Sequence, residues 1–248
     1  MVIIILPAFN EAEGIGELIE QVGTSLSAIE YHIVVVNDGS DDDTGKIVTK
    51  MTDLYPVTLL THEQNKGAGQ AIATGIEHAC HQYNSDDYVV TMDADNTQSP
   101  DLILTMLDAA SSGADIVIAS RFVEGGGQVG VPWHRGLLSH GARIVFRVLF
   151  PMKIKDYTSF YRLYRVKLLK EASALFTPLL EVRGFAAILE LLIKLRLFRP
   201  TITQVPLYLR YDLKAGGSKM KILKTLKEYG FLILRLKLIS MRTPTVKS

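Results

Sequence analysis

The segment DYVVTMDADNTQSP, residues 87–100, indicates the fold, because it joins a β-rich apolar run to two carboxylates and then to a helix start. Side chains two residues apart on a strand point the same way, so Asp93 and Asp95 are expected to face one point just beyond the sheet. Ser99 and Pro100 are typical of an N-cap and a first helical position. The segment therefore predicts a strand, an acidic loop and a helix in succession.

The same order of elements repeats through the first half of the chain. Continuous apolar strands that alternate with helical spacing predict an α/β fold, a doubly wound, mostly parallel sheet with helices on both faces. Ligands of such sheets bind beyond the carboxyl ends of the strands, where the motifs LPAFNE, NDGSDDD, DADN and SRF fall here. The predicted strands are residues 2–6, 32–36, 57–60, 87–92 and 115–120, and the predicted helices lie near 11–28, 43–54, 68–83 and 99–112.

The pattern changes in the second half, and we place a soft boundary that divides one domain into residues 1–121 and 122–248. The second part, which is basic, is expected to meet an anionic partner. The elements expected after the boundary are a Gly-rich loop at 123–133, a basic helix that ends at Pro151, an amphipathic helix near 179–197, a strand at 201–209 and a final basic helix.

Charge is divided unevenly between these halves. Residues 1–120 contain 3 Lys and Arg against 19 Asp and Glu, whereas residues 121–248 contain 24 against 7. The formal net charge of +1 therefore conceals an acidic half and a basic half. The basic half is expected to meet phosphate or a membrane surface, with two solvated faces that happen to differ as the alternative.

Length and composition indicate one globular α/β domain with an appended segment. The single cysteine, Cys80, excludes an intramolecular disulfide and a zinc site built on cysteines alone. The run MVIIIL lacks the basic start and the cleavage site of a signal peptide, and no uncharged apolar run reaches the ~18 residues of a membrane-spanning helix. A membrane crossing is therefore not expected.

Two acidic motifs each have a functional and a structural interpretation. Mg²⁺ and Mn²⁺ take oxygen ligands, and Mg²⁺ typically uses one or two carboxylates with substrate phosphates completing the shell, so Asp93 and Asp95 are candidate metal ligands. Asp38, at the turn after the second strand, could accept hydrogen bonds from a base or a ribose. Either motif could instead be a simple turn before a helix.

Several segments could bind phosphate. Backbone amides of NKGAGQA, residues 65–71, could approach one, but a dinucleotide fingerprint should follow the first strand, so NAD is not expected. Arg121 ends the fifth strand at the same sheet edge as the aspartates. Arg135 and Ser139, one helical turn apart, could grip a phosphate monoester, unless this stripe is a solvated basic face.

The C-terminal segment favours an anionic surface. From residue 210 onward the chain has ten Lys and Arg against two Asp and Glu. Such a helix is typical of one lying on an anionic membrane, although a helix that packs on the core with snorkelling lysines fits as well. Nucleic acid is disfavoured because no stacking aromatics are interleaved with the basic residues. The polar stripe of this helix consists of Lys221, Lys224, Glu228, Arg235 and Arg242.

Eight motifs occur in a fixed order, and together they resemble the family 2 inverting glycosyltransferases, in particular the dolichyl-phosphate mannosyltransferases and polyprenyl-phosphate glycosyltransferases. They are ILPAFNEAEGI, VVVNDGSDDDT, NKGAGQAIATGI, TMDADNTQSPDLI, DIVIASRF, DYTSFYRLYR, ELLIKLRLFRPTITQVPL and GGSKMKI. The resemblance covers about residues 2–240. It implies a GT-A type doubly wound sheet with C-terminal amphipathic helices. Phe160 stands where the family usually has Gly, and Thr97 where it often has Gln.

The resemblance also implies roles for the two parts of the domain and for individual residues. Residues 1–121 would be the nucleotide-sugar-binding half, and residues 122–248 the acceptor-binding and membrane-associating half. The nucleotide sugar would be bound by Pro7, Phe9, Glu11, Val36, Asp38, Asp93, Ala94, Asp95 and Lys219. Asp95 would be the main metal ligand, with Asp93 beside it. Arg121, Arg135 and Ser139 would bind the acceptor phosphate. Asp95 and Arg121 are the residues implied in catalysis.

The implied reaction moves mannose or another hexose from a nucleotide-diphosphate sugar, GDP-mannose before a UDP-sugar, to a polyprenyl phosphate with inversion, using Mg²⁺ or Mn²⁺. A phosphate monoester has a second pKa of about 6, so it is already an anionic nucleophile at neutral pH. No general base is then required, and the sequence has no evident His–carboxylate pairing. The implied location is cytoplasmic, peripherally on the cytoplasmic face of a membrane. The alternatives are transfer to a hydroxyl acceptor and a non-catalytic, membrane-associated protein that binds nucleotide sugars.

Overall fold

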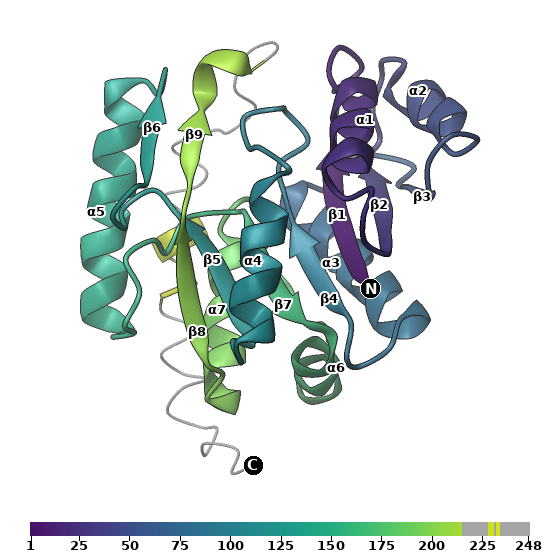
Figure 1. Cartoon of the computed structure of the whole chain (residues 1–248). Coiled ribbons are helices and arrows are strands. Elements are labelled where there is room, and N and C mark those ends of the chain that lie inside the picture. The colour runs from purple at the N-terminus through teal and green to yellow at the C-terminus, as the bar shows by residue number, and fades with distance from the viewer. Residues whose placement is uncertain (215–227, 231, 234–248) are drawn as a thin grey trace.

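A computed structural model describes residues 1–214, 228–230 and 232–233, apart from the side chains of residues 134, 135, 137, 138, 140 and 142. A seven-stranded sheet in the order β3-β2-β1-β4-β7-β5-β8 forms its centre, and a small sheet of β6 and β9 lies beside it (Figure 1). The strands are β1 Val2–Ala8, β2 Tyr31–Asn37, β3 Val57–Thr61, β4 Tyr88–Thr91, β5 Ile116–Ser120, β6 Gly127–Val129, β7 Arg162–Arg165, β8 Ile202–Pro206 and β9 Tyr208–Arg210.

The five strands predicted in the first half are confirmed. Strand β1 pairs in parallel with β2 and β4, and β2 pairs in parallel with β3. Ile3 and Ile5 face one hydrophobic core, whereas Ile4 and Leu6 face the other. Because a strand covered on both faces needs apolar residues at every position, the unbroken run VIIIL suits the centre of the sheet.

Helices cover both faces of the sheet, as predicted. Helices α1, α2 and α4 contribute to one core, and α3, α6 and α7 contribute to the other. Helix α4 begins at Leu102, so the predicted start at Ser99 and Pro100 lies early, and these residues belong to the turn before it. The helices are α1 Ile15–Ser25, α2 Thr44–Met51, α3 Ala68–Gln82, α4 Leu102–Ser111, α5 Trp133–Leu149, α6 Val166–Leu175 and α7 Ala187–Leu195.

Strand β7 is not among the predicted strands, and it changes how the two halves of the chain meet. It runs antiparallel between β4 and β5, so that Thr91 and Ile118 both lie opposite Arg162. Strand β8, also from the second half, extends the sheet in parallel beside β5. A four-residue strand with an arginine at each end has no apolar run that periodicity could detect.

Helix α7 corrects the expectation of an amphipathic helix that begins near residue 179. It begins at Ala187, and all of its residues are buried. The Lys194 ammonium donates to the Glu190 carboxylate one turn away at 2.7 Å, so the polar side of this helix is an internal ion pair. Glu190 also accepts two backbone N–H groups of the preceding loop.

The described part of the C-terminal segment packs on the protein core. Leu232 is buried, and the Tyr229 ring lies edge-on to Phe146 at 5.1 Å between centroids. Tyr229 and Leu232 therefore pack as the core-packing alternative predicts. The predicted C-terminal amphipathic helices are not confirmed. Of the predicted stripe, Lys221, Lys224, Arg235 and Arg242 lie outside the described residues.

Helix α5 has an exposed apolar face. Trp133 is 79% exposed, Ile144 is 62% exposed and Val148 is 75% exposed. Separations of eleven and four residues bring these side chains to one side of a helix. No helix within the described part of the chain has both the length and the apolarity to cross a membrane.

Candidate active site

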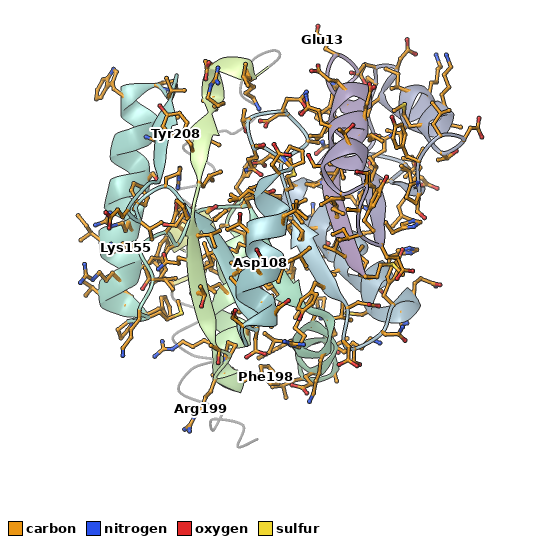
Figure 2. The ribbon with its side chains drawn as sticks, in the orientation of Figure 1. Glu13, Asp108, Lys155, Phe198, Arg199 and Tyr208 are labelled. Carbon is orange, nitrogen blue, oxygen red and sulfur yellow. The ribbon has the colours of Figure 1, made fainter. Side chains whose placement is uncertain are left out.

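The candidate site lies at the end of the sheet toward which the parallel strands run. The loops after β1, β2, β4 and β5 gather there, and the loop before β7 reaches the same end because β7 is antiparallel. Figure 2 marks this end by Glu13, in the loop after β1, and the opposite end by Phe198 and Arg199.

The Asp93–Asp95 loop follows β4 and is held by its own neighbours. The Thr97 hydroxyl donates to Asp95 Oδ1 at 2.7 Å, and the Gln98 amide donates to Asp93 Oδ2 at 2.6 Å. The other oxygen of Asp95, Oδ2, accepts a hydrogen bond from the Lys214 ammonium. Thr97 therefore orients the carboxylate that is the predicted metal ligand.

Electrostatics at this loop favour an added positive charge. Burial, and next the Asp95 carboxylate, raise the pKa of Asp93 to about 8. The charges of Lys214 and Arg121 oppose this rise. Two carboxylates this close favour any positive charge placed between them, and Lys214 supplies one.

The carboxylate oxygens of this loop have the chemistry of the predicted Mg²⁺ or Mn²⁺ site. The Lys214 ammonium is a stand-in cation on Asp95 Oδ2, and the side chains of both residues are 12% exposed. Within the described ranges, no group of three or more His, Cys, Asp or Glu side chains is arranged to hold a metal ion. The shell would therefore need oxygens from a bound ligand, which is how Mg²⁺ commonly binds beside phosphates.

The predicted nucleoside residues lie around the ends of β1 and β2. Pro7 is half-buried near the end of β1, Ala94 is buried in the loop after β4, and the Val36 side chain belongs to the hydrophobic core. The two loops are cross-linked, because the Glu11 N–H donates to Thr44 Oγ1 at 2.8 Å and the N–H of Asn10 donates to Ser40 Oγ at 3.0 Å. Phe9 lies in the same loop, and Lys219 lies outside the described residues.

Asp38 is buried, and its carboxylate forms hydrogen bonds within the protein. Its carboxylate accepts hydrogen bonds from the N–H groups of Lys66 and Gly67, at 2.9 and 2.8 Å, and bonds His62 Nδ1 at 2.7 Å. His62 Nε2 in turn bonds Thr74 Oγ1 at 3.0 Å. The expectation that the chain has no His–carboxylate pairing is therefore wrong, because His62 and Asp38 are 24 positions apart but adjacent in the sheet.

The Gly-rich segment at 65–71 packs against protein. The Gly69 N–H donates to the Arg183 carbonyl at 2.8 Å. A side chain at Gly67, whose φ is +98°, would collide with the same carbonyl. These glycines therefore let the loop before α7 approach the start of α3, and the alternative of a phosphate cradle is not supported at these two residues.

Arg121, at the end of β5, forms the second charged cluster of the site. Its guanidinium forms two hydrogen bonds to Asp156, from Nε at 2.9 Å and from Nη2 at 3.0 Å. Nη2 also lies 3.2 Å from Ser139 Oγ and 2.8 Å from Thr158 Oγ1. The structure thus brings together Arg121 and Ser139, while the Arg135 side chain lies outside what it describes.

Sequence reasoning missed Asp156 and Thr158. Burial by itself would raise the pKa of Asp156, but the charge and hydrogen bonds of Arg121 outweigh it and hold the pKa below its ordinary value. The signal was the DYTS motif, since Asp often bonds the backbone two residues on. Phe160, the departure from the family pattern, is buried and faces Phe185 edge-on.

Comparisons with known proteins identify the family of the chain. The profile of the family described as Glycosyl transferase family 2 matches residues 3–172. A dolichol-phosphate mannosyltransferase of Pyrococcus furiosus is 32% identical over 228 residues, which is 91% of this chain and 60% of that protein. A polyprenol monophosphomannose synthase of Mycolicibacterium smegmatis is 33% identical over 68% of this chain and 63% of that protein. The chain therefore spans less than two thirds of both relatives.

A third relative is matched over most of its length. An undecaprenyl-phosphate mannosyltransferase of Micrococcus luteus is 28% identical over 88% of this chain and 87% of that protein. Among solved structures, glucosyl-3-phosphoglycerate synthase from Mycobacterium tuberculosis, in complex with Mn²⁺, uridine diphosphate and phosphoglyceric acid, is similar with a TM-score of 0.68 and 20% identity. That alignment covers 98% of this chain and 79% of the other. It confirms the predicted GT-A type fold.

Proposed function

The chain belongs to glycosyl transferase family 2, and on that premise we propose that it transfers a hexose from a nucleotide-diphosphate sugar to a polyprenyl phosphate, with inversion. One observation carries the proposal. The acidic Asp93–Asp95 loop and the Arg121 cluster lie at the ends of β4 and β5, separated by β7 alone. A site that joins a donor diphosphate to an acceptor phosphate needs two such centres, one for each anion. The names of three relatives, all of which describe transfer of mannose to a polyprenyl-type phosphate, support the same assignment.

The chemistry follows from the two clusters. An anionic oxygen of the acceptor phosphate attacks the anomeric carbon, the bond from that carbon to the donor diphosphate breaks, and the nucleoside diphosphate leaves with its electron pair. Because the acceptor is already ionised at neutral pH, no side chain has to remove a proton. Asp156 is not available as a base in any case, because Arg121 occupies both of its oxygens.

The acidic cluster has the task of holding the donor. Asp95, with Asp93 beside it, would hold Mg²⁺ or Mn²⁺, and the ion would neutralise charge on the departing diphosphate. Mn²⁺ in the solved relative from Mycobacterium tuberculosis supports a divalent ion without choosing between the two metals. Thr97 and Gln98 orient the two carboxylates, and Lys214 adds a positive charge at the same point. We favour GDP-mannose as donor, with a UDP-sugar as the second candidate.

We propose that the protein lies peripherally on the membrane that holds its lipid acceptor. The exposed side chains of Trp133, Ile144 and Val148 give α5 an apolar face, and Arg147 is exposed near its end. Such a helix can insert shallowly between anionic headgroups. Ser139 lies on this same helix, so an acceptor phosphate at the surface would be close to Arg121. Sedimentation with and without vesicles that contain anionic lipid measures this association.

The test is an assay of the purified chain with several nucleotide sugars, Mn²⁺ or Mg²⁺, and farnesyl phosphate as a short acceptor. We expect release of nucleoside diphosphate together with a prenyl-phosphate sugar, loss of both on chelation of the metal, and one strongly preferred donor. Farnesol, which has the same chain and no phosphate, is the matched control. Equal transfer to farnesol would favour the hydroxyl-acceptor alternative, and donor binding without transfer to either acceptor would favour the non-catalytic one.

A further inference from the structure

The loop Asp156–Tyr161 lies between the two charged clusters of the site. It leads into β7, and Arg162 at the start of β7 pairs with Thr91 at the end of β4 and with Ile118 of β5. An antiparallel strand inserted between parallel ones begins where its neighbours end. The loop is therefore positioned by the sheet itself.

Asp156 organises this loop and is 0% exposed. Its carboxylate accepts six hydrogen bonds, from the backbone N–H groups of Arg121, Thr158 and Ser159, from Arg121 Nε and Nη2, and from the Thr158 hydroxyl. An ionised carboxylate offers about four lone-pair sites, so no site is left for a proton or a metal ion. Asp156 thus fixes the direction in which both Arg121 and Thr158 point.

The hydroxyl of Thr158 has a different environment from its neighbours. Within Asp156–Tyr161, Thr158 is the one residue that is not buried. Arg121 Nη2 carries two protons but faces three acceptors, Asp156 Oδ1 at 3.0 Å, Thr158 Oγ1 at 2.8 Å and Ser139 Oγ at 3.2 Å. The single proton of the Thr158 hydroxyl lies within reach of Asp156 Oδ1 at 3.2 Å and of Ser139 Oγ at 3.1 Å. Because Asp156 Oδ1 already accepts three shorter hydrogen bonds, this proton can turn to a further acceptor.

We propose that Thr158 is a direct phosphate-binding residue of the acceptor site, and that Asp156 is the positioning residue that fixes Arg121 and Thr158 in it. The ligand class is a phosphate monoester, whose terminal oxygens would accept from the guanidinium and the two hydroxyls. This assignment rests on the proposed function for the identity of the acceptor.

The experiment compares Thr158→Val, which keeps the shape and removes the hydroxyl, with Ser159→Ala, which removes the hydroxyl next to it. Ser159 Oγ is buried and has no hydrogen-bond partner among the described residues, so its loss should leave activity unchanged. We expect Thr158→Val to raise KM for farnesyl phosphate about tenfold, as loss of one hydrogen bond to a charged group typically does. KM for the donor and slow donor hydrolysis by water should not change, and Thr158→Ser should restore the acceptor KM.

Asp156→Asn provides a second measurement of the positioning role. It should raise the KM for farnesyl phosphate and leave donor hydrolysis unchanged, because it disturbs only the acceptor side. If Asp156→Asn does not fold, Thr158→Val still decides the proposal. A wild-type chain that transfers sugar, together with equal KM values for Thr158→Val and Ser159→Ala, would overturn the inference and leave the proposed function intact. Equal losses of transfer and donor hydrolysis in Thr158→Val would overturn it too, whereas a wild type that never uses a prenyl phosphate would contradict the proposed function instead.

Discussion

The two charged clusters of the site use the same residue types in opposite ways. In the Asp93–Asp95 loop, two carboxylates are crowded together, and the pKa of Asp93 rises to about 8. Beside β5, a single carboxylate, Asp156, collects six hydrogen bonds, and its pKa is held below the ordinary value by Arg121. The carboxylates of both clusters are partly or fully shielded from water, so burial alone does not distinguish the two clusters.

The difference shows how a functional carboxylate can be told from a structural one. A carboxylate whose lone pairs are all used is part of the scaffold, whatever its burial. Two carboxylates that repel one another favour a positive charge beside them, and Lys214, which comes from 119 positions away, supplies one here. Asp156 is thus closed to ligand, and the acidic loop is the cluster at which we propose that a metal ion binds.

The strongest test of this comparison is Asp95→Asn, which keeps the shape of the side chain and removes its charge. We expect transfer to fall by about 10³-fold or more, because stabilisation of the leaving diphosphate by a metal is worth several kcal/mol. The fold should be retained, since Asp95 is not part of the core. Asp108→Asn, on the exposed surface of α4, is the matched control. Unchanged metal-dependent turnover in Asp95→Asn would remove the metal assignment.

A smaller effect, now on stability, is expected for Asp156→Asn. This change leaves the Arg121 guanidinium, whose side chain is 13% exposed, without its charged partner. Breaking a buried pair in this way typically costs about 3–5 kcal/mol, measured by denaturant unfolding at neutral pH. Activity should fall less than it does in Asp95→Asn.

The pH dependence of that loss has a definite sign. Because the folded pKa of Asp156 is lowered from 3.8, its contribution to stability is present above the ordinary pKa and is lost as the pH falls through the folded value. Melting temperatures of wild type and Asp156→Asn should therefore converge below about pH 4. A gap that stays constant from pH 3 to pH 8 would mean that the carboxylate charge is not what stabilises the loop.

The smallest expected effect concerns Lys214→Met, which keeps the apolar stem and removes the ammonium. Without that stand-in cation, Asp95 should bind Mn²⁺ more tightly when no nucleotide is present, by about threefold to tenfold for a pair of this modest exposure. Titration of Mn²⁺ followed by electron paramagnetic resonance measures this affinity independently of activity. Lys46→Met, which breaks an exposed surface pair with Asp43, is the control. Equal or weaker binding in Lys214→Met would show that Lys214 does not compete with the metal.

The sequence was sufficient to predict what depends on local pattern. Unbroken apolar runs identified five parallel strands, and the polar motifs at their ends located the acidic loop and Arg121. Each predicted strand coincides with the apolar run that indicated it, and the acidic loop and Arg121 directly follow β4 and β5. The same reasoning identified the amphipathic α5, where Ser139 does lie beside Arg121.

What the sequence did not predict depends on pairing between distant segments. Nothing in RLYR indicates that it enters the sheet between β4 and β5, so the contact of Arg121 with Asp156 could not be foreseen. The His62–Asp38 pair was missed for a similar reason, since only the parallel pairing of β2 and β3 makes these residues neighbours. The prediction for helix α7 was wrong because it placed Glu190 and Lys194 on a solvent-exposed face. They form an internal ion pair instead.

The position of β7 also sets an order in time for a chain that is made from its N-terminus. Strands β1 to β4 pair with one another, and all are complete once Thr91 has been synthesised. The sheet partners of β5 are β7 and β8, which both come later in the chain. A nascent chain that ends after β5 but before β7 can therefore form the acidic loop. It still lacks Asp156, the residue that holds Arg121 in place. The segment with the acidic loop would leave the ribosome well before the segment with Asp156, and the two clusters meet only when β7 enters the sheet.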